Sequence, residues 1–195
     1  KKEVVEAMLP YYTDIWGNAS SKFYQTGMDA ITALDKLRAS VAKNIGAAKP
    51  NEIYFTGSGC EADNWAVKGI AFSHKDKGNH IITTKIEHHA ILNTCKFLEK
   101  QGFKVTYLDV ESDGIVSPEA VEAAITEDTI LISIMTANNE IGTVEPIKEI
   151  AEVARRHKII FHTDAVQAIG HMPINVQDLG VDMLSLSAHK FHGPK

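Results

Sequence analysis

The apolar run Thr129-Ile-Leu-Ile-Ser-Ile-Met135 predicts a β-strand that is buried on both of its faces. A strand with one face in water alternates apolar and polar residues, whereas this run is apolar almost throughout. Strands of this kind are typical of parallel sheets that helices cover on both sides. The run therefore favours an α/β fold, and the sequence around it supports the same conclusion.

Strand and helix patterns alternate on both sides of this run. Further short strands are predicted at residues 53–55, 80–84, 104–108, 159–162 and 183–186. Apolar residues at helical spacing predict helices at residues 2–12, 28–45, 61–72, 89–101, 118–125 and 147–157. This alternation predicts a three-layer α/β architecture, in which a mostly parallel sheet has helices on both faces.

The composition indicates a class of protein and argues against two classes of partner. The chain has 195 residues, 44% of them hydrophobic, and a formal net charge of −5, as expected of a globular domain. No stretch approaches the ~20 apolar residues of a membrane helix, and the mildly acidic, mixed charge predicts neither a nucleic-acid nor a membrane partner. Two cysteines, Cys60 and Cys95, are too few for a disulfide framework or a multi-cysteine metal site. We therefore expect a cytoplasmic protein without a metal.

The two ends of the sequence predict a fragment of a longer protein. The chain begins at Lys1 without a methionine, and it ends inside Ser187-Ala-His-Lys-Phe-His-Gly-Pro-Lys195. A Gly-Pro pair is typical of a turn inside a domain. We expect one incomplete domain over residues 1–195, with a helical segment at about 1–45 and an α/β core at about 50–195.

Polar residues follow several of the predicted strands, and parallel sheets bind ligands beyond the carboxyl ends of their strands. Gly57-Ser-Gly-Cys60 precedes a helix, where backbone N–H groups bind phosphate well, although a plain tight turn explains it equally. Glu87-His88-His89 follows the strand at 80–84. A histidine there can stack on a planar ligand or transfer a proton, or the pair can simply lie on the surface.

Three further segments follow buried strands. Asn138-Asn139-Glu140 offers amides to a polar ligand or forms a plain turn. Asp164, with Gln167 close behind it, would need a cationic partner in a dry cleft, unless it caps a helix. Lys190 follows the last strand and can act as a nucleophilic amine or as an ion-paired surface lysine. A phosphate turn, a stacking histidine, an acid and an amine together predict pyridoxal 5′-phosphate as cofactor.

Five motifs in this order resemble those of the cysteine desulfurases, class-V pyridoxal phosphate enzymes of fold type I. They are Thr56-Gly-Ser-Gly-Cys-Glu-Ala-Asp-Asn64, Glu87-His-His-Ala-Ile91, Asn138-Asn-Glu-Ile-Gly142, His162-Thr-Asp-Ala-Val-Gln167 and the run from Ser187 to Lys195. The resemblance covers residues from about 18 to 195 and is greatest to the NifS/IscS-like branch. It implies the large, cofactor-binding domain of an enzyme that removes sulfur from L-cysteine as an enzyme persulfide and releases L-alanine. It also implies a homodimer and a sulfur-acceptor protein, such as an iron–sulfur scaffold.

The resemblance assigns roles to individual residues. Lys190 matches the lysine that holds the cofactor, and Asp164 matches the acid on the pyridine nitrogen. Gln167 matches the amide near the ring hydroxyl. His88 matches the histidine that stacks on the ring and moves protons, and Asn139 matches an asparagine near cofactor and substrate. We expect Lys190 and His88 to be the catalytic residues.

The phosphate ligands implied by the resemblance are Ser187, His189 and the backbone of Gly59 and Cys60. Cys60 departs from the family, which commonly has threonine there. Neither Cys60 nor Cys95 matches the family's nucleophilic cysteine, which lies on a later loop, so we expect this chain alone to lack desulfurase activity. The alternatives are a related class-V lyase or aminotransferase, such as a selenocysteine lyase or a kynureninase-like enzyme, or a non-catalytic domain with this fold.

Overall fold

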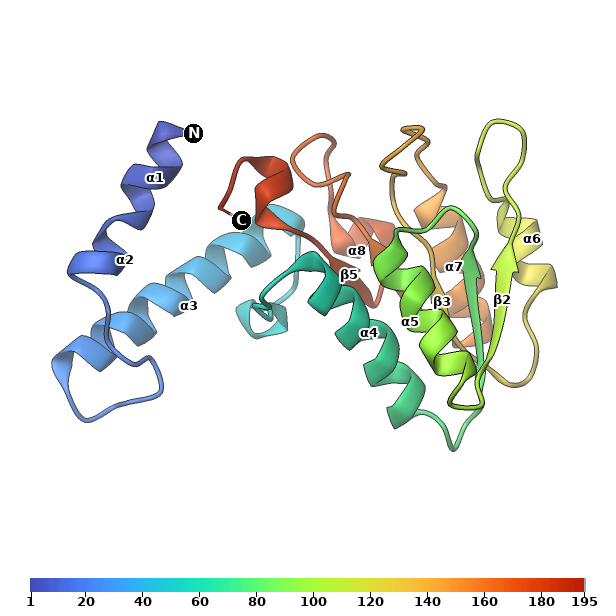
Figure 1. The fold of residues 1–195 in the computed structure, drawn as a ribbon, viewed down its shortest axis with the longest axis horizontal. Helices are drawn as coiled ribbons and strands as arrows, with labels where there is room; N and C mark the ends of the chain where they lie inside the picture. Colours follow the sequence, from blue (N-terminus) through green and yellow to red (C-terminus); the bar gives the residue numbers. More distant parts are fainter. Residues whose placement is uncertain (195) are drawn as a thin grey trace. The chain divides into compact units, whose positions relative to one another are not determined.

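The computed structural model describes residues 1–194, so Lys195, the last residue of the final motif, lies outside the described residues. The chain divides into two compact units (Figure 1). One contains Lys1–Phe55 and the residues from Ala188 onward, and the other contains Thr56–Ser187. Within the described part of the chain, no helix combines the length and the apolar character that a membrane crossing requires.

The unit Thr56–Ser187 is built on a parallel sheet of five strands in the order β2-β1-β3-β4-β5. Every residue of β3, the strand predicted from the apolar run, is buried. This confirms the α/β fold with a parallel sheet. The strands are β1 (His80–Thr84), β2 (Lys104–Leu108), β3 (Thr129–Ser133), β4 (Ile160–Asp164) and β5 (Met183–Ser185).

Helices cover both faces of this sheet. Consecutive residues of a strand point to opposite faces, so Ile81 packs with α4 and α5 while Ile82 packs with α6 and α7. The two hydrophobic clusters that result lie on either side of the sheet, as the three-layer prediction requires. The helices of this unit are α4 (Gly59–Ser73), α5 (His89–Glu99), α6 (Pro118–Ala123), α7 (Ile147–His157) and α8 (Val176–Leu179).

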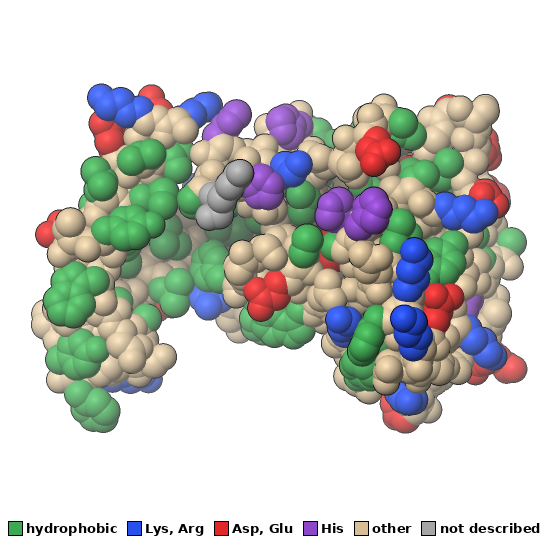
Figure 2. Space-filling view, viewed as in Figure 1, with side chains coloured by type: hydrophobic (Ala, Val, Ile, Leu, Met, Phe, Trp, Pro, Cys, Tyr) green, Lys and Arg blue, Asp and Glu red, His purple; other side chains and the backbone are tan. Residues whose placement is uncertain are grey.

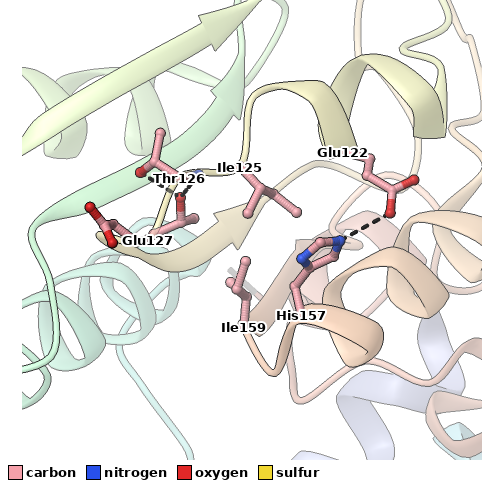
Figure 3. Close-up of a pocket in the computed structure, with 7 residues that line it drawn as sticks. Glu122, Ile125, Thr126, Glu127, His157 and Ile159 are labelled. Carbon is pink, nitrogen blue, oxygen red and sulfur yellow. Dashed lines mark hydrogen bonds and ion pairs between the residues drawn. The ribbon is translucent and has the colours of Figure 1, made fainter.

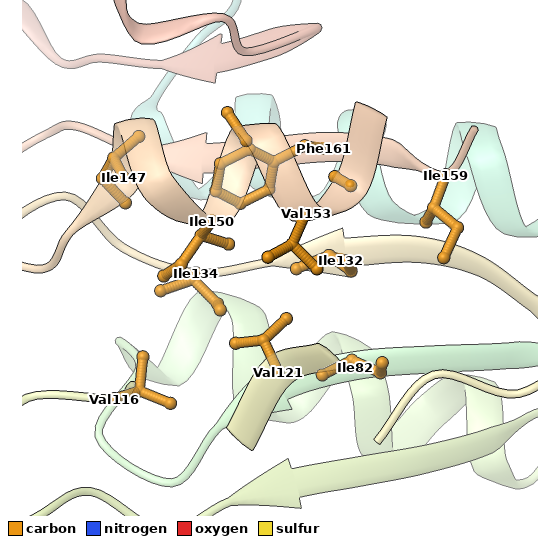
Figure 4. Packing of buried hydrophobic residues seen from close by; sticks show 12 residues of the cluster. Ile82, Val116, Val121, Ile132, Ile134, Ile147, Ile150, Val153, Ile159 and Phe161 are labelled. Atoms are coloured by element: carbon orange, nitrogen blue, oxygen red, sulfur yellow. The ribbon is translucent and has the colours of Figure 1, made fainter. Parts of the chain in front are cut away.

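The cluster between the sheet and α7 is the larger of the two hydrophobic cores. Figure 4 shows Ile150 and Val153 of α7 beside Ile132 of β3, with Phe161 of β4 next to them. Ile132, Ile150 and Phe161 are completely buried. Burial of each such side chain stabilises the fold by about 1.5–3 kcal/mol. These contacts hold the strands in register and so fix the positions of the residues that follow each strand.

The other unit is mainly helical, and its first helical segment differs from the prediction. The expected helix over residues 2–12 is two helices, α1 (Lys2–Met8) and α2 (Pro10–Thr13), because Pro10 has no N–H to continue the first. The predicted long helix is confirmed as α3 (Gln25–Ile45), and it ends at Gly46 with φ of 70°. The short helices η1 (Pro50–Glu52) and η2 (Ala188–Phe191) complete the unit.

Large apolar side chains are exposed on this helical unit. Figure 2 shows hydrophobic side chains gathered on the surface over α1, α2 and α3. Phe23 is 100% exposed and Trp16 is 69% exposed, so neither contributes to a core within the chain. Apolar surface of this extent is uncommon on a monomeric protein. The exposed apolar residues of this segment include Val5, Leu9, Tyr11, Tyr12, Trp16, Phe23, Tyr24, Met28 and Leu37.

The predicted strand at residues 53–55 is wrong. This segment follows η1 and pairs with no strand within the described residues. The carbonyl of Ile53 accepts a hydrogen bond from the side chain of Arg38 instead, and the Arg38 guanidinium lies 5.1 Å from the centre of the Phe55 ring. The Arg38 side chain of α3 therefore makes the hydrogen bond to Ile53 that a neighbouring strand would otherwise make. The four-residue helix α8 was not predicted, because it is too short to show a helical period.

Candidate active site

The polar residues that follow the strands lie at one edge of the unit Thr56–Ser187. All five strands are parallel, so their carboxyl ends meet at the same edge of the sheet. His88 follows β1, Asn139 follows β3, Asp164 ends β4 and Ser187 follows β5. The fold thus brings these four predicted residues to the edge where parallel sheets bind ligands.

The N-terminus of α4 has the features of an anion-binding helix terminus. Ser58 caps the helix by accepting a hydrogen bond from the N–H of Glu61 at 3.1 Å, and the Glu61 carboxylate accepts one from the N–H of Gly57 at 2.5 Å. These bonds fix the turn before the helix. The N–H groups of Gly59 and Cys60 occupy the first helical positions, which have no partner within a helix. Such N–H groups bind phosphate.

Gly59 packs tightly against the segments that leave β4 and β5. A Cβ atom placed on Gly59 would lie 3.2 Å from Val166 Cγ2 and 3.3 Å from Ser187 Cβ. The same position lies 3.7 Å from the Ser187 hydroxyl oxygen. The start of α4 and the Ser187 hydroxyl therefore converge on one small region, and a side chain at position 59 would require Val166 and Ser187 to shift by a few tenths of an ångström.

Gly59→Ala is expected to destabilise this unit by about 1–3 kcal/mol, because Val166 and Ser187 must move away from the new methyl group. It should also weaken binding of inorganic phosphate. Gly69→Ala in the same helix is the control, since its Cβ would lie 3.7 Å from Trp65 Cδ1, an ordinary contact. Urea unfolding and phosphate titration measure both effects. Equal behaviour of the two variants would contradict a tight cradle at Gly59.

His88 lies at the start of α5 on a well-anchored turn. Its Nδ1 accepts a hydrogen bond from the N–H of Ala90 at 3.1 Å, so the neutral ring carries its proton on Nε2. The preceding residue, Glu87, is buried and accepts hydrogen bonds from the Thr84 hydroxyl at 2.8 Å and the N–H of Met135 at 3.0 Å. Glu87 thereby connects the turn that carries His88 to β1 and to the segment that follows β3. The His88 side chain itself is exposed.

Asn138 and Asn139 differ in their surroundings. Asn138 is buried, donates to the carbonyl of Ile86 at 2.7 Å and accepts from the N–H groups of Glu140 and Ile141. It therefore holds the loop after β3 against the turn before His88. Asn139 is exposed, and its contact with a cofactor and substrate stays a prediction.

Asp164 is buried at the last position of β4. Its Oδ1 accepts a hydrogen bond from the N–H of Val166 at 2.8 Å, which closes a turn after the strand. Gln167 lies in the same turn and is half-buried. The predicted alternative of a helix cap at Asp164 is wrong, because a turn and not a helix follows it.

Two further buried acids, Asp63 and Glu87, interact electrostatically with Asp164. Burial raises the pKa of Asp63 well above its ordinary value, the charge of Asp164 raises it further, and a hydrogen bond from Ser185 lowers it in part. Burial also raises the pKa of Glu87 to about 8, and the charges of Asp164 and Asp63 add to this effect. One oxygen of Asp63 and one of Glu87 have no hydrogen-bond partner among the described residues. Burial and the charge of Asp164 therefore favour the protonated forms of Asp63 and Glu87 at this end of the sheet.

No role is predicted from the sequence for Asp63, Glu87 or His162. One buried face of α4 carries Asp63, Val67 and Ala71 at a spacing of four residues. An acid on the apolar face of a predicted helix is therefore the sequence signal that could have identified Asp63. His162 is completely buried and bonds to Ser133 at 2.9 Å. No sequence pattern predicts a contact between residues as far apart in the chain as Ser133 and His162.

Lys190 and His189 lie on η2, in the unit that contains the N-terminal helices. His192 follows with a φ of 72°, a left-handed conformation that is unusual for a residue other than glycine. The roles of Lys190 and His189 in holding a cofactor stay predictions.

The two cysteines occupy different environments. Cys95 is completely buried in the core between α4, α5 and the sheet, as expected of a core residue. Burial raises the pKa of its thiol to about 12, which keeps it protonated and unreactive. Cys60 is exposed in the first turn of α4. Both are free thiols.

A pocket of about 370 Å³ lies at the opposite edge of the sheet. Figure 3 shows Thr126, Ile159 and His157 around it, with His157 hydrogen-bonded to Glu122 at 3.0 Å. Its residues precede β3 and β4 or, in the case of Thr129, begin β3, whereas the predicted site residues lie at or after the carboxyl ends of strands. It is separate from the edge that carries Asp164.

Comparison with known proteins agrees with this arrangement. The sequence matches the Aminotransferase class-V family over residues 1–195. Cysteine desulfurase IscS of Methanosarcina thermophila and that of Clostridium botulinum (strain Hall) are each 60% identical to it over 195 residues. These matches cover 100% of this chain but 48% and 49% of those proteins. The chain thus spans about half the length of the curated relatives it matches.

Solved structures give the same result. A structure described as "SspA in complex with cysteine" superposes with a TM-score of 0.95 at 45% identity, covering 100% of this chain and 56% of that chain. A structure described as "NIFS-LIKE PROTEIN" superposes with a TM-score of 0.96 at 42% identity, covering 100% of this chain and 53% of that chain. From its sequence match over all 195 residues, this chain belongs to the aminotransferase class-V family.

Proposed function

We propose that this chain is the cofactor-binding part of a pyridoxal phosphate-dependent cysteine desulfurase. The enzyme would break the C–S bond of L-cysteine, pass the sulfur to an enzyme cysteine as a persulfide and release L-alanine. The observation that carries the proposal is the convergence of the α4 N-terminus, Ser187 and Asp164 at one edge of the sheet. Its 60% identity to proteins named cysteine desulfurase favours this reaction over others of the family.

The described residues fit the phosphate of this cofactor. Gly59 has no side chain, so a phosphate can approach its N–H closely. A Cβ at this position would also press on Ser187 and Val166. The first N–H groups of a helix of 15 residues and one hydroxyl then face the same region. The Gly59 and Cys60 backbone and the Ser187 hydroxyl would hold the phosphate. The thiol of Cys60 is not required for this, since the contact is made by its N–H.

The described residues also fit a protonated pyridine ring. Asp164 is buried at the last position of β4, and its charge raises the pKa of the nearby acids Asp63 and Glu87. A carboxylate in this position would favour the protonated form of a pyridine nitrogen placed beside it. Asp164 would hold the proton on that nitrogen, and Gln167 in the next turn would orient the ring.

The remaining predicted residues would handle the substrate and its protons. Pyridoxal phosphate, when bound, supplies an electron sink for the substrate's α-carbon. Lys190 would hold the cofactor and take the α-proton, and His189 would contact the phosphate. His88 would stack on the ring and offer its Nε2 for proton transfer, since its Nδ1 is occupied by the N–H of Ala90. Asn139 would contact cofactor and substrate from the loop after β3.

The partners of the enzyme are part of the same proposal. The exposed apolar residues over α1, α2 and α3 support a homodimer, because surface of this kind is covered in an assembly. The persulfide would pass to a sulfur-acceptor protein, such as an iron–sulfur scaffold. Two free thiols suit a reducing, cytoplasmic location.

The test is a product assay on the full-length protein that contains this chain. L-cysteine and pyridoxal phosphate are added with a thiol reductant, which releases the persulfide as sulfide, and alanine and sulfide are measured together. We expect equal amounts of both products and many turnovers per enzyme. The absence of alanine, or alanine formation only from selenocysteine or kynurenine, would contradict the proposal.

A further inference from the structure

Asn138 is a buried asparagine that joins two loops at the carboxyl edge of the sheet. Its Nδ2 donates a hydrogen bond at 2.7 Å to the carbonyl oxygen of Ile86, in the turn between β1 and α5. Its Oδ1 accepts hydrogen bonds from the N–H groups of Glu140 at 2.8 Å and Ile141 at 3.0 Å, in the loop after β3. One side chain therefore shapes its own loop and also connects that loop to a turn 52 residues earlier in the chain.

The side-chain amide of Asn138 is fully engaged within the unit Thr56–Ser187. Such an amide has two N–H donors and two acceptor lone pairs. Nδ2 also donates to Met135 Sδ at 3.4 Å, and the two backbone N–H groups of the loop occupy the oxygen. These two donors also identify which end of the amide is the oxygen, since an amide nitrogen could not accept from them. Asn138 therefore has no polar side-chain atom to offer to a ligand, in contrast to the exposed Asn139.

Glu87 forms a second link between the same two segments, in the opposite direction. It is buried in the turn before α5, and its Oε1 accepts a hydrogen bond from the N–H of Met135 at 3.0 Å. A side chain of the turn thus bonds the backbone after β3, while a side chain after β3 bonds the backbone of the turn. A buried polar group that loses its partner pays the full cost of desolvation, so each link resists opening. These two hydrogen bonds together form the Glu87–Asn138 linkage.

The Glu87–Asn138 linkage lies directly beside two residues of the proposed active site. His88 follows Glu87 in the chain, and Asn139 follows Asn138. On its other side, His88 is fixed by α5, because its Nδ1 accepts a hydrogen bond from the N–H of Ala90 at 3.1 Å. The linkage before His88 and the helix after it therefore hold the backbone of His88 from both sides.

We propose that Asn138, together with Glu87, is a positioning residue that fixes the turn carrying His88 to the loop carrying Asn139. This rests on the proposed function, in which His88 transfers a proton and Asn139 contacts cofactor and substrate. The two contact residues are then held as one rigid group rather than on two independent loops. Asn138 acts only through them and contacts neither cofactor nor substrate.

Two substitutions of Asn138 break the link to Ile86 and leave the loop turn in place. In Asn138→Asp the carboxylate still accepts from the two N–H groups of its loop, but an oxygen replaces Nδ2 and faces the Ile86 carbonyl. Asn138→Ser adds no charge: its hydroxyl can still close a turn with a following N–H, but it is too short to reach Ile86. Asn79→Asp is the control, because it also loses an amide bond to a backbone carbonyl, that of Gly102 at 3.2 Å, but lies before β1 at the opposite edge.

Amide hydrogen exchange of the full-length protein freed of cofactor is the first readout, at about pH 7.5, where an ordinary aspartate is ionised. The reporters are the N–H groups of residues 90–92, which bond to His88. We expect them to exchange at least about fivefold faster in both Asn138 variants, because the turn before them is released. Residues 148–156 of α7 should keep the parental rate, as should residues 90–92 in Asn79→Asp. Unchanged exchange at 90–92, or an equal acceleration in α7, would overturn the proposal.

The turnover of L-cysteine by the full-length enzyme is the second readout. Asn138→Asp should lower kcat at least about fivefold and leave KM within about threefold, because the loop that carries Asn139 keeps its turn. The same change made in His88→Ala should alter kcat by less than about twofold, since the ring that Asn138 positions is then absent. Equal losses of kcat in the two backgrounds would overturn the proposal. If the parent forms no alanine, the proposed function fails, while the exchange rates still decide whether Asn138 holds the turn of His88.

Discussion

Lys190→Ala is expected to reduce the turnover of L-cysteine by at least about 10²–10⁴-fold, the usual contribution of one proton-transfer group. The loss should be greater still, because the proposed role of Lys190 includes holding the cofactor covalently. The visible absorbance of the lysine-bound cofactor should disappear as well. Alanine production and an absorbance scan from 330 to 430 nm, the range of a lysine-bound pyridoxal group, measure the two effects.

Lys85→Ala is the matched control for this variant. Lys85 follows β1, and its exposed side chain forms an ion pair with Asp109 at 2.6 Å. Surface pairs of this kind contribute about 0–1 kcal/mol, so turnover should remain close to that of the parent. Undiminished alanine production by Lys190→Ala would remove Lys190 from the catalytic assignment.

Asp164→Asn should produce the second large loss. The carboxylate is buried at the end of β4, and loss of one member of a buried ion pair costs about 2–5 kcal/mol. This corresponds to a decrease of about 30- to 5,000-fold in cofactor affinity or in turnover. The amide keeps the shape of the side chain and can still accept the hydrogen bond from Val166, so the fold should survive.

Kinetics and circular dichroism of this variant separate its effect on the site from its effect on the fold. Asp109→Asn serves as control, since the Asp109 side chain is 81% exposed and forms only the surface pair with Lys85. A native fold with greatly reduced turnover is the expected result for Asp164→Asn. Turnover near that of the parent would leave Asp164 with a structural role only.

The α/β core could be predicted because each of its elements has a local signal. The observed bounds of β1, β2 and α7 match the predicted ranges, since apolar runs and a helical period mark them in the sequence. Pro10 and Arg38 account for the two wrong predictions in the helical unit, the helix over residues 2–12 and the strand at 53–55. Pro10 divides a helix that periodicity alone would continue, and Arg38 bonds the carbonyl that a strand at 53–55 would have used.

The site could be predicted in outline for a different reason. Parallel strands bring their carboxyl ends together, so His88, Asp164 and Ser187 could be placed at one edge from their positions after strands. The acid cluster could not be found in this way. Asp63 and His162 lie on α4 and β4 and approach each other only in the folded unit, and burial decides their charge. The position of Lys190 relative to this edge stays a prediction from the resemblance.

The most direct test of this account is to locate the cofactor on the chain. The full-length protein is loaded with pyridoxal phosphate, reduced with borohydride and digested, and the labelled peptide is identified by mass spectrometry. The account predicts a single pyridoxyl label on Lys190, in the peptide that follows β5. A label on another lysine, or labels spread over several surface lysines, would contradict it.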